Sequence, residues 1–151
     1  MVLDDIRQQH PGFGFKVLAT DICTSVLEQA RAAVFPAEMA MAVPEDLRRR
    51  YFLRARDPAA GTVRLTPEIR QSAHFGRLNL MDERYPIAGD MDAIFCRNVL
   101  IYFDRQRQKA VLERLCRHLK VGGHLFISHT ETAAGMDLPL RQVTVAVHQR
   151  V

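Results

Sequence analysis

The sequence predicts a doubly wound α/β sheet in a single domain. Short apolar runs suit buried strands, segments with helical spacing lie between them, and the chain has 151 residues, within the ~100–200 that single domains commonly have. Strands that alternate with helices form parallel sheets covered by helices. Hydrophobic residues make up 48% and charged residues 25% of the chain, which excludes a disordered or collagen-like protein.

In the first third of the chain we expect a strand at 16–20, a helix from 24 or 25 to 34, and a second short helix from 44 to 52. The apolar run that ends at Asp21 suits a strand buried on both faces. Thr24 or Ser25 is the expected N-cap of the first helix, and Pro36 either ends it or bends the chain beyond it. Pro44 and the acidic residues after it favour a helix N-terminus.

Further along, we expect extended segments at 62–66 and 73–78, strands at 91–96, 124–128 and 142–147, and a helix from 105 to 120. The first two segments are interpreted as a small antiparallel excursion inserted at 54–78. The helix follows Asp104, and Gly122 with Gly123 is expected to terminate it.

Net charge and hydropathy limit the classes of function. Lys and Arg number 21 against 17 Asp and Glu, and the excess lies mainly at 48–77 and 105–120. Such a surface can attract nucleic acid, anionic lipid or an acidic protein partner, but solvated helix and hairpin faces are the more common cause. The aromatic-rich basic motif of RNA-binding sheets is missing, so we expect no nucleic-acid partner.

No apolar stretch approaches the ~18 residues of a membrane span, and residues 1–10 carry charges where a signal peptide has an apolar core. We therefore expect a cytoplasmic protein without membrane insertion. Cys23, Cys96 and Cys116 stand far apart and form no C-x-x-C pair, which predicts reduced packing residues and no metal site.

Polar residues follow three of the predicted strands, at Asp21, at Arg97-Asn98 and at 128–131. Open α/β sheets bind ligands beyond the carboxyl ends of their strands. The two oxygens of a carboxylate in the position of Asp21 match two adjacent ribose hydroxyls. The alternative is that Asp21 only caps the following helix, and the local pattern leaves both interpretations open.

Segments along the chain resemble the chemotaxis receptor methyltransferases of the CheR family. They are 19–22 (ATDI), 77–82 (RLNLMD) and above all 95–104 (FCRNVLIYFD), with 50–52 and 119–123 in agreement. The resemblance covers about 15–147, and the run at 95–104 is its most specific part. It implies a Rossmann-like fold with a small antiparallel β-subdomain. The implied reaction transfers a methyl group from S-adenosylmethionine to chemoreceptor glutamates and leaves S-adenosylhomocysteine.

The resemblance also assigns residues to the cofactor. Asp21 matches the acidic residue that holds the ribose. Asn79 and Leu80 match the pair that borders the adenine, and Cys96 and Arg97 match residues beside the reacting sulfonium. Leu80 and Cys96 are alternatively plain core residues.

By the same resemblance, Arg97 and Tyr102 are the candidate catalytic residues. A glutamate is ionised at neutral pH and the methyl group is already activated by a positive sulfur, so no strong base is required and positioning supplies most of the rate. Arg97 is expected to orient the carboxylate through paired N–H donors, and Tyr102 to donate its hydroxyl near the methyl group. Asn98 is expected to shape the same pocket. Tyr102 is alternatively a packing residue at a helix start.

The sequence departs from the family pattern at the cofactor. Family members carry an N-terminal helical domain and a first strand that ends in a Gly-rich turn with two acidic residues, and neither stretch occurs here. We therefore interpret 1–151 as a partial catalytic domain, incomplete at its N-terminus. We expect it to be inactive or weak alone and to self-associate through exposed strand edges.

A second departure concerns docking to the chemoreceptor helical bundle. The excursion at 54–78 matches the family's β-subdomain, which in some members binds a receptor-tail peptide as an added strand. Ala55 and Asp57 stand where those members have glycines, Gly61 remains, and Arg64 stands where a basic residue could meet a peptide carboxylate. We expect independence from the tail peptide. The alternative function is a non-catalytic or truncated methyltransferase-like module in signalling or protein interaction.

Overall fold

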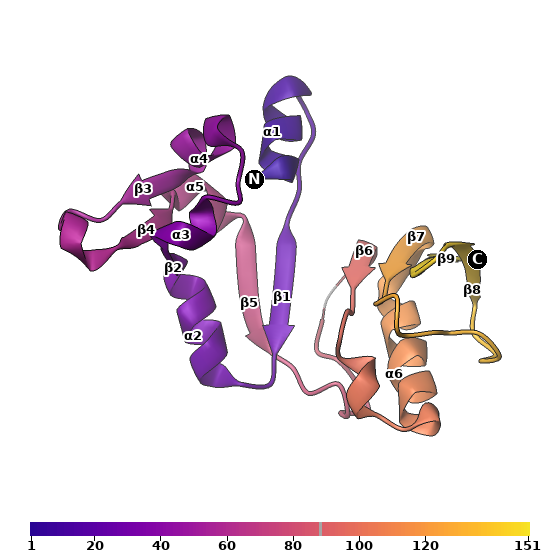
Figure 1. Cartoon of the computed structure of the whole chain (residues 1–151). Coiled ribbons are helices and arrows are strands. Elements are labelled where there is room, and N and C mark those ends of the chain that lie inside the picture. The colour runs from indigo at the N-terminus through magenta and orange to yellow at the C-terminus, as the bar shows by residue number, and fades with distance from the viewer. Residues whose placement is uncertain (88) are drawn as a thin grey trace. The chain divides into compact units, whose positions relative to one another are not determined.

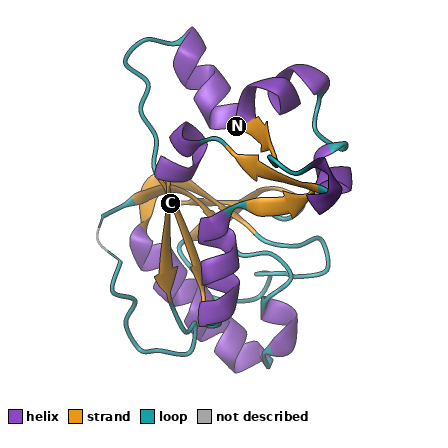
Figure 2. Cartoon of the chain, turned by 90° about the vertical axis from the view of Figure 1, so that its left-hand side faces the viewer, coloured by secondary structure: helices purple, strands orange, loops and turns teal. Residues whose placement is uncertain are grey.

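The computed structural model describes residues 1–87 and 89–151, which form two compact units, Met1–Asn79 and Leu80–Val151 (Figure 1). Both units contain helices and strands, as the alternating sequence pattern predicts. Figure 2 distinguishes the two kinds of element by colour. Within these described residues, every helix is too short or too polar to cross a membrane.

A two-stranded parallel sheet underlies the first unit. Its strands are β1 (Val17–Asp21) and β5 (Ala73–Arg77), paired in register along their whole length, and α2 (Thr24–Ala32) packs against both. The expectation that 73–78 belongs to an antiparallel excursion is wrong. An extended pattern predicts a strand but not its partner, and here the partner lies more than fifty residues upstream.

A three-stranded antiparallel sheet lies between those strands in the sequence, with the order β2-β4-β3. It consists of β2 (Val34–Pro36), β3 (Phe52–Arg54) and β4 (Thr62–Leu65). The predicted strand at 62–66 is confirmed, but the sheet begins well before the expected excursion at 54–78. Two of its strands have three residues each, which is too short for a periodic pattern.

The other helical segments of the first unit are α1 (Val2–Gln9), α3 (Ala37–Ala40), α4 (Glu45–Tyr51), η1 (Pro58–Ala60) and α5 (Pro67–Gln71). Of these, α4 confirms the short helix predicted at 44–52. The predicted cap of α2 is wrong. Cys23 is the N-cap, without a side-chain cap bond, so Thr24 and Ser25 already lie in the first turn. Ala33 adopts a left-handed conformation with φ 50° and directs Val34 into a strand.

A buried carboxylate joins α1 to α4. Asp4 is 3% exposed and accepts hydrogen bonds from the Tyr51 hydroxyl (3.0 Å) and from Nε2 of Gln8 (3.1 Å), and it forms an ion pair with Arg7. Burial by itself would raise the pKa of Asp4, but these hydrogen bonds and the Arg7 charge lower it below its ordinary value. The ionised form of Asp4 therefore stabilises the folded chain.

Because the folded pKa of Asp4 lies below the unfolded value, its contribution is present above about pH 4 and is lost as the pH falls through the folded pKa. We expect Asp4→Asn to lower the free energy of unfolding by about 1–2 kcal/mol at pH 7 and by less at pH 3. Urea unfolding of both chains at the two pH values measures this. An equal loss at both would contradict the pKa argument.

The second unit contains a four-stranded sheet with the order β6-β7-β9-β8 (Figure 1). The strands are β6 (Met91–Phe95), β7 (Leu119–Phe126), β8 (Leu140–Thr144) and β9 (Val147–Arg150). β6 and β7 are parallel and are connected through α6 (Arg105–His118), whose apolar face packs against β7. Asp104 caps α6, since its Oδ1 accepts from the Arg107 amide at 2.9 Å.

Two boundaries in the second unit differ from the prediction. Gly122 and Gly123 lie inside β7 and do not end the helix. They stand at an irregularity in the pairing with β6, where Gly122 has φ 82° and a Cβ on Gly123 would meet the Asp92 carbonyl oxygen at 3.0 Å. The single strand expected at 142–147 is wrong as well, because the chain reverses at Ala146 (φ 64°) and forms a hairpin of two strands.

Candidate functional site

In the first unit, Asp21 is half-buried at the carboxyl end of β1. Its Oδ1 accepts a hydrogen bond from the Cys23 amide (2.8 Å), and its carbonyl accepts from the Leu78 amide (3.0 Å). Among the described residues, no donor meets the other carboxylate oxygen, Oδ2. This bond forms a local turn before α2 and does not cap the helix, because Cys23 itself is the N-cap, and the second oxygen of Asp21 is available for a hydroxyl ligand.

Asn79 and Leu80 follow β5 and are both half-buried. Leu78 before them is buried, which fixes the chain at this point. The Leu80 carbonyl accepts hydrogen bonds from the Tyr85 hydroxyl (2.8 Å) and from Nη1 of Arg114 (3.3 Å). The Leu80 side chain is only half-buried and is not among the buried core residues, which argues against the alternative that it is a plain core residue.

The segment after β6 carries most of the remaining predicted residues. Cys96 is 6% exposed, and its amide continues the strand pairing by donating to the Phe126 carbonyl (2.8 Å). Asn98 adopts the left-handed region with φ 58°, a conformation that asparagine tolerates better than most residues. Leu100, 1% exposed, anchors the segment in the core. The chain therefore turns sharply at Asn98, with a fixed point on either side.

A residue that the sequence analysis did not single out holds this turn. The buried side chain of Glu131 accepts hydrogen bonds at Oε1 from the amides of Val99 (3.0 Å) and Leu100 (2.8 Å), and at Oε2 from the amide of Ser128 (2.7 Å). The one signal for it was its place in the polar run at 128–131, directly after a strand.

Arg97 and Tyr102 project from the same segment into solvent. Both side chains are exposed, Tyr102 by 80%, and Tyr102 lies in the short 3-10 helix η2 (Leu100–Tyr102). Within the part of the chain that the structure describes, neither side chain has a hydrogen-bond or ion-pair partner. An uncommitted guanidinium on a well-held backbone can bind a carboxylate through two parallel hydrogen bonds. The exposure of Tyr102 argues against a packing role.

Burial raises the pKa of the Cys96 thiol to about 11, and the charge of Glu131 acts in the same direction. Burial likewise raises the pKa of Cys116 to about 11. Both sulfurs are thus protonated at neutral pH and are poor nucleophiles. A methyl donor beside Cys96 would therefore meet an unreactive thiol.

We expect a thiol reagent such as Ellman's reagent to modify one cysteine quickly in the native chain at pH 7.5 and the other two only after unfolding. Cys23 is exposed, and hydrogen bonds from Ser25 and Val26 lower its pKa, so it is the fast site. Mass spectrometry identifies the modified residue, with Cys23→Ser as the control. Fast reaction at Cys96 in the native chain would contradict its burial.

The predicted residues are divided between the two units. The first unit holds Asp21 and Asn79, and the second holds Leu80 together with the segment 96–102. In each unit they follow the carboxyl ends of parallel strands, where α/β sheets bind ligands. Outer edges of both sheets are open, since among the described residues β1 pairs only with β5 and β6 only with β7.

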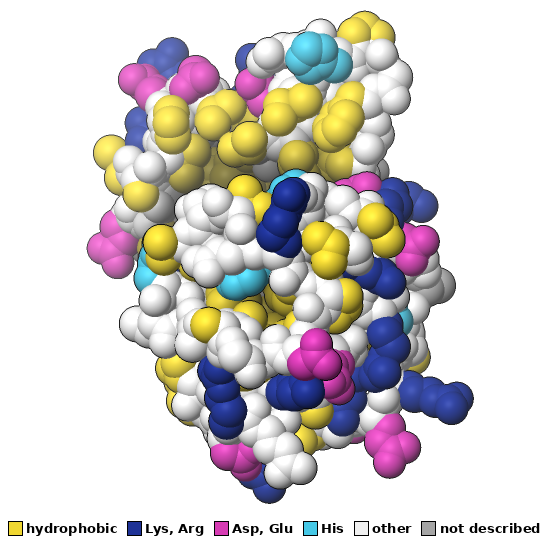
Figure 3. Space-filling view, turned by 90° about the vertical axis from the view of Figure 1, so that its right-hand side faces the viewer, with side chains coloured by type: hydrophobic (Ala, Val, Ile, Leu, Met, Phe, Trp, Pro, Cys, Tyr) yellow, Lys and Arg dark blue, Asp and Glu magenta, His cyan; other side chains and the backbone are white. Residues whose placement is uncertain are grey.

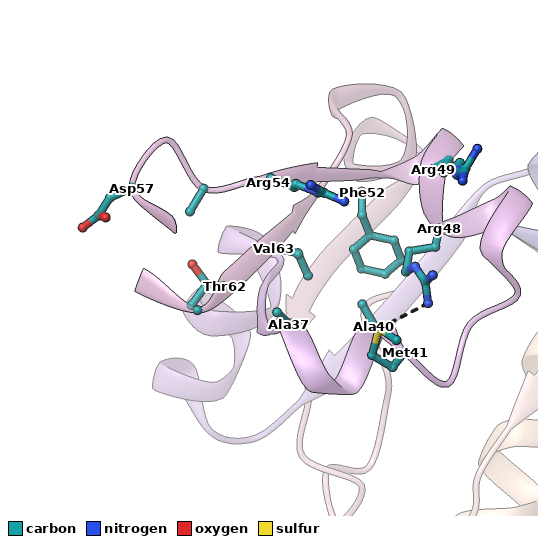
Figure 4. Close-up of a pocket in the computed structure, with 12 residues that line it drawn as sticks. Ala37, Ala40, Met41, Arg48, Arg49, Phe52, Arg54, Asp57, Thr62 and Val63 are labelled. Carbon is teal, nitrogen blue, oxygen red and sulfur yellow. Dashed lines mark hydrogen bonds between the residues drawn. The ribbon is translucent and has the colours of Figure 1, made fainter. Parts of the chain in front are cut away.

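A cavity of about 540 Å³ lies elsewhere, between α3, α4 and the antiparallel sheet (Figure 4). Phe52, Met41 and Val63 contribute apolar surface, and Arg48 and Arg54 bring positive charge to its rim. No predicted cofactor residue lines this cavity, which belongs to the β-subdomain.

Basic side chains do not form a continuous surface on the face drawn in Figure 3, where Asp and Glu lie among the Lys and Arg. Several cations are committed locally: Arg105 donates to the carbonyl of Thr132 (3.1 Å), and Lys120 pairs with Asp92 (2.7 Å).

Comparison with known proteins identifies the family. The model of the CheR methyltransferase SAM-binding domain matches residues 1–148. The chain is 41% identical over 133 residues to "Chemotaxis protein methyltransferase 2" of Pseudomonas aeruginosa, covering 88% of this chain and 48% of the relative. It is 39% identical over 148 residues to the "Chemotaxis protein methyltransferase" of Salmonella typhimurium, covering 96% and 51%. A solved glycopeptide N-methyltransferase, MtfA with S-adenosylmethionine, matches with a TM-score of 0.46 at 17% identity, covering 90% of this chain and 43% of that one.

The match to the family model defines a methyltransferase domain of the class that binds S-adenosylmethionine. The chain belongs to the CheR methyltransferase family, as the sequence resemblance implied, and it spans about half the length of the curated relatives that it matches.

Proposed function

We propose that the protein methylates glutamate side chains of chemoreceptors, with S-adenosylmethionine as the methyl donor. The observation that carries this proposal is the segment after β6, where Glu131 fixes the backbone and Arg97 and Tyr102 stand uncommitted beside it. Membership of a chemotaxis methyltransferase family supports the reaction class.

One observation supports the assignment of the predicted residues to the cofactor. Oδ2 of Asp21 lacks a donor among the described residues and can accept from a ribose hydroxyl. Asn79 and Leu80 are assigned to the adenine, and Cys96, Arg97 and Asn98 to the surroundings of the sulfonium. When bound, S-adenosylmethionine supplies a methyl group on a positively charged sulfur.

The residues of this chain act mainly by positioning. Arg97 binds the ionised glutamate through paired N–H donors and directs one carboxylate oxygen at the methyl group. Tyr102 donates its hydroxyl to the same carboxylate and limits its rotation. No proton has to be removed from an ionised carboxylate, and bound S-adenosylmethionine would give up its methyl group to that oxygen and leave as S-adenosylhomocysteine.

The proposed partner is the cytoplasmic helical bundle of a chemoreceptor, without dependence on a tail peptide. Arg64 already donates from Nε to the Ala32 carbonyl at the end of α2 (2.9 Å), so part of its guanidinium is committed within the chain. Three free cysteines agree with a reducing compartment, and we place the reaction in the cytoplasm.

For the 151 residues alone we propose weak activity and self-association. The open edges of β1 and β6 carry exposed apolar side chains, with Leu18 40% and Phe95 70% exposed. Analytical ultracentrifugation over a concentration series checks this: a monomer at every concentration would contradict it.

Transfer of a labelled methyl group tests the function. The protein, in the longest form that its gene encodes, is incubated with methyl-labelled S-adenosylmethionine and receptor fragments with or without their tails. Base-labile label on both fragments, lost when the accepting glutamates are glutamines, is the expected result. Label that depends on the tail would overturn the peptide-independence, and no label on any receptor would favour a non-catalytic module.

A further inference from the structure

We propose that Glu131 is a positioning residue, which holds the backbone at 97–100 so that Arg97 and Tyr102 are presented for methyl transfer. This inference rests on the proposed function and assigns to the same site a residue from another part of the chain. Glu131 itself touches neither the cofactor nor the receptor glutamate in this account, and it acts through the backbone of the turn.

The hydrogen bonds of Glu131 connect the ends of two neighbouring parallel strands. Pairing between β6 and β7 continues to the bond from the Cys96 amide to the Phe126 carbonyl. The backbone pairing between the two strands ends there. Beyond that point both oxygens of one carboxylate span the gap, Oε1 to the two amides after β6 and Oε2 to the Ser128 amide after β7. The Glu131 carboxylate therefore links the two strand ends beyond the last backbone hydrogen bond between them.

The loop that carries Glu131 is itself closed. The Glu131 amide donates to the Ser128 carbonyl (3.0 Å), so residues 128–131 form a tight turn that directs the Glu131 carboxylate back toward the end of β6. Ala133, two residues further on, is 8% exposed and anchors the chain after this turn. The carboxylate is thus presented from a fixed loop.

Side-chain packing alone does not hold the turn at 97–98. Arg97 and Asn98 are exposed, and the backbone at Asn98 lies in the left-handed region, which is less favourable than the common conformations. Leu100 is the fully buried anchor, but it follows the turn. The bonds to the Val99 and Leu100 amides therefore determine how the turn leaves the sheet.

An ionised carboxylate suits three amide donors, because both oxygens only accept. In Glu131→Gln one oxygen becomes an NH₂ group, which opposes an amide N–H on one side of the gap. The variant keeps the size of the side chain and changes one atom. We expect it to release the turn while α6 and the sheet stay folded.

Asp104→Ala is the matched control. Asp104 is also a carboxylate that accepts from a backbone amide, that of Arg107 (2.9 Å), and it stands a few residues after Leu100 at the start of α6. Its loss weakens a helix cap and leaves the turn at 97–100 intact.

Hydrogen–deuterium exchange on the 151-residue chain measures the turn directly. In Glu131→Gln we expect exchange at 97–102 to rise by about tenfold or more, with 108–118 still protected. In Asp104→Ala the change is expected at the first turn of α6. Unchanged exchange at 97–102 in Glu131→Gln would overturn the inference.

Kinetics in the longest form of the protein separate positioning from folding. We expect Glu131→Gln to lower kcat about 10–100-fold and to change the Kd for S-adenosylhomocysteine by less than about threefold, whereas Asp104→Ala stays near wild type. A kcat within twofold of wild type despite a released turn would overturn the positioning role. If the wild-type protein methylates no receptor, the proposed function fails, and the exchange result still decides whether Glu131 holds the turn.

Discussion

Replacing Arg97 by alanine is expected to lower methyl transfer to receptor glutamates by about 100-fold, the loss that misplaced reactants commonly cause. The guanidinium has no partner among the described residues and is exposed, so its removal leaves the fold and the melting temperature unchanged. The effect should fall mainly on turnover and on the KM for receptor. Affinity for S-adenosylhomocysteine should fall less, because Asp21 and Asn79 are assigned to the rest of the cofactor.

Three further variants locate the cause of this loss. Arg97→Lys keeps the charge but not the planar fork, and we expect it to recover only part of the rate. Tyr102→Phe removes one hydroxyl from an exposed ring and should cost about tenfold. Arg107→Ala removes another exposed arginine of the same unit, one that pairs with Asp104, and should retain full activity. Unchanged turnover in both Arg97→Ala and Tyr102→Phe would contradict the assigned roles.

Replacing Asp21 by alanine should weaken binding of S-adenosylhomocysteine by about 10–100-fold, since hydrogen bonds to a charged group contribute about 1.5–3 kcal/mol. Asp21→Asn keeps one acceptor oxygen and should lie between alanine and wild type. The measurement is calorimetric titration of the longest form of the protein.

Asp57→Ala is the matched control for Asp21. Oδ1 of Asp57 accepts from the Ala59 amide two residues ahead (2.9 Å), just as Oδ1 of Asp21 accepts from the Cys23 amide (2.8 Å). Both substitutions thus remove the same local turn contact, and only Asp21 is assigned to the cofactor. Equal affinities in the Asp21 and Asp57 variants would support the interpretation that Asp21 only shapes a turn.

Strands and helices with enough residues for a pattern were predictable from the sequence. The apolar run before Asp21, the helix after Asp104 and the short helix after Pro44 all appear near their expected places. The pairing of the strands was not predictable, because β5 pairs with β1 across a long intervening segment. The strands β2 and β3 were not predictable either, because they have three residues each. The place of the two glycines in β7 was not predictable, because a β-bulge and a helix end both favour glycine.

The sequence points to the candidate side chains but not to the residues that hold them in place. Arg97 and Tyr102 stand out in a specific run of residues, and the structure finds both exposed on one segment, while their roles stay predictions. Glu131 lies thirty-two residues beyond Val99, and its role depends on three backbone amides, which carry no signature in side-chain identity. The raised pKa of Cys96 likewise depends on burial, which a single sequence does not show.

Titration of the protein with S-adenosylhomocysteine tests the central claim, that this chain carries the cofactor-binding residues of a methyltransferase. We expect the longest form that the gene encodes to bind the ligand with one site per chain. Asp21→Ala should lower that affinity. No binding by the longest form, with the protein folded, would contradict the claim and favour a non-catalytic module.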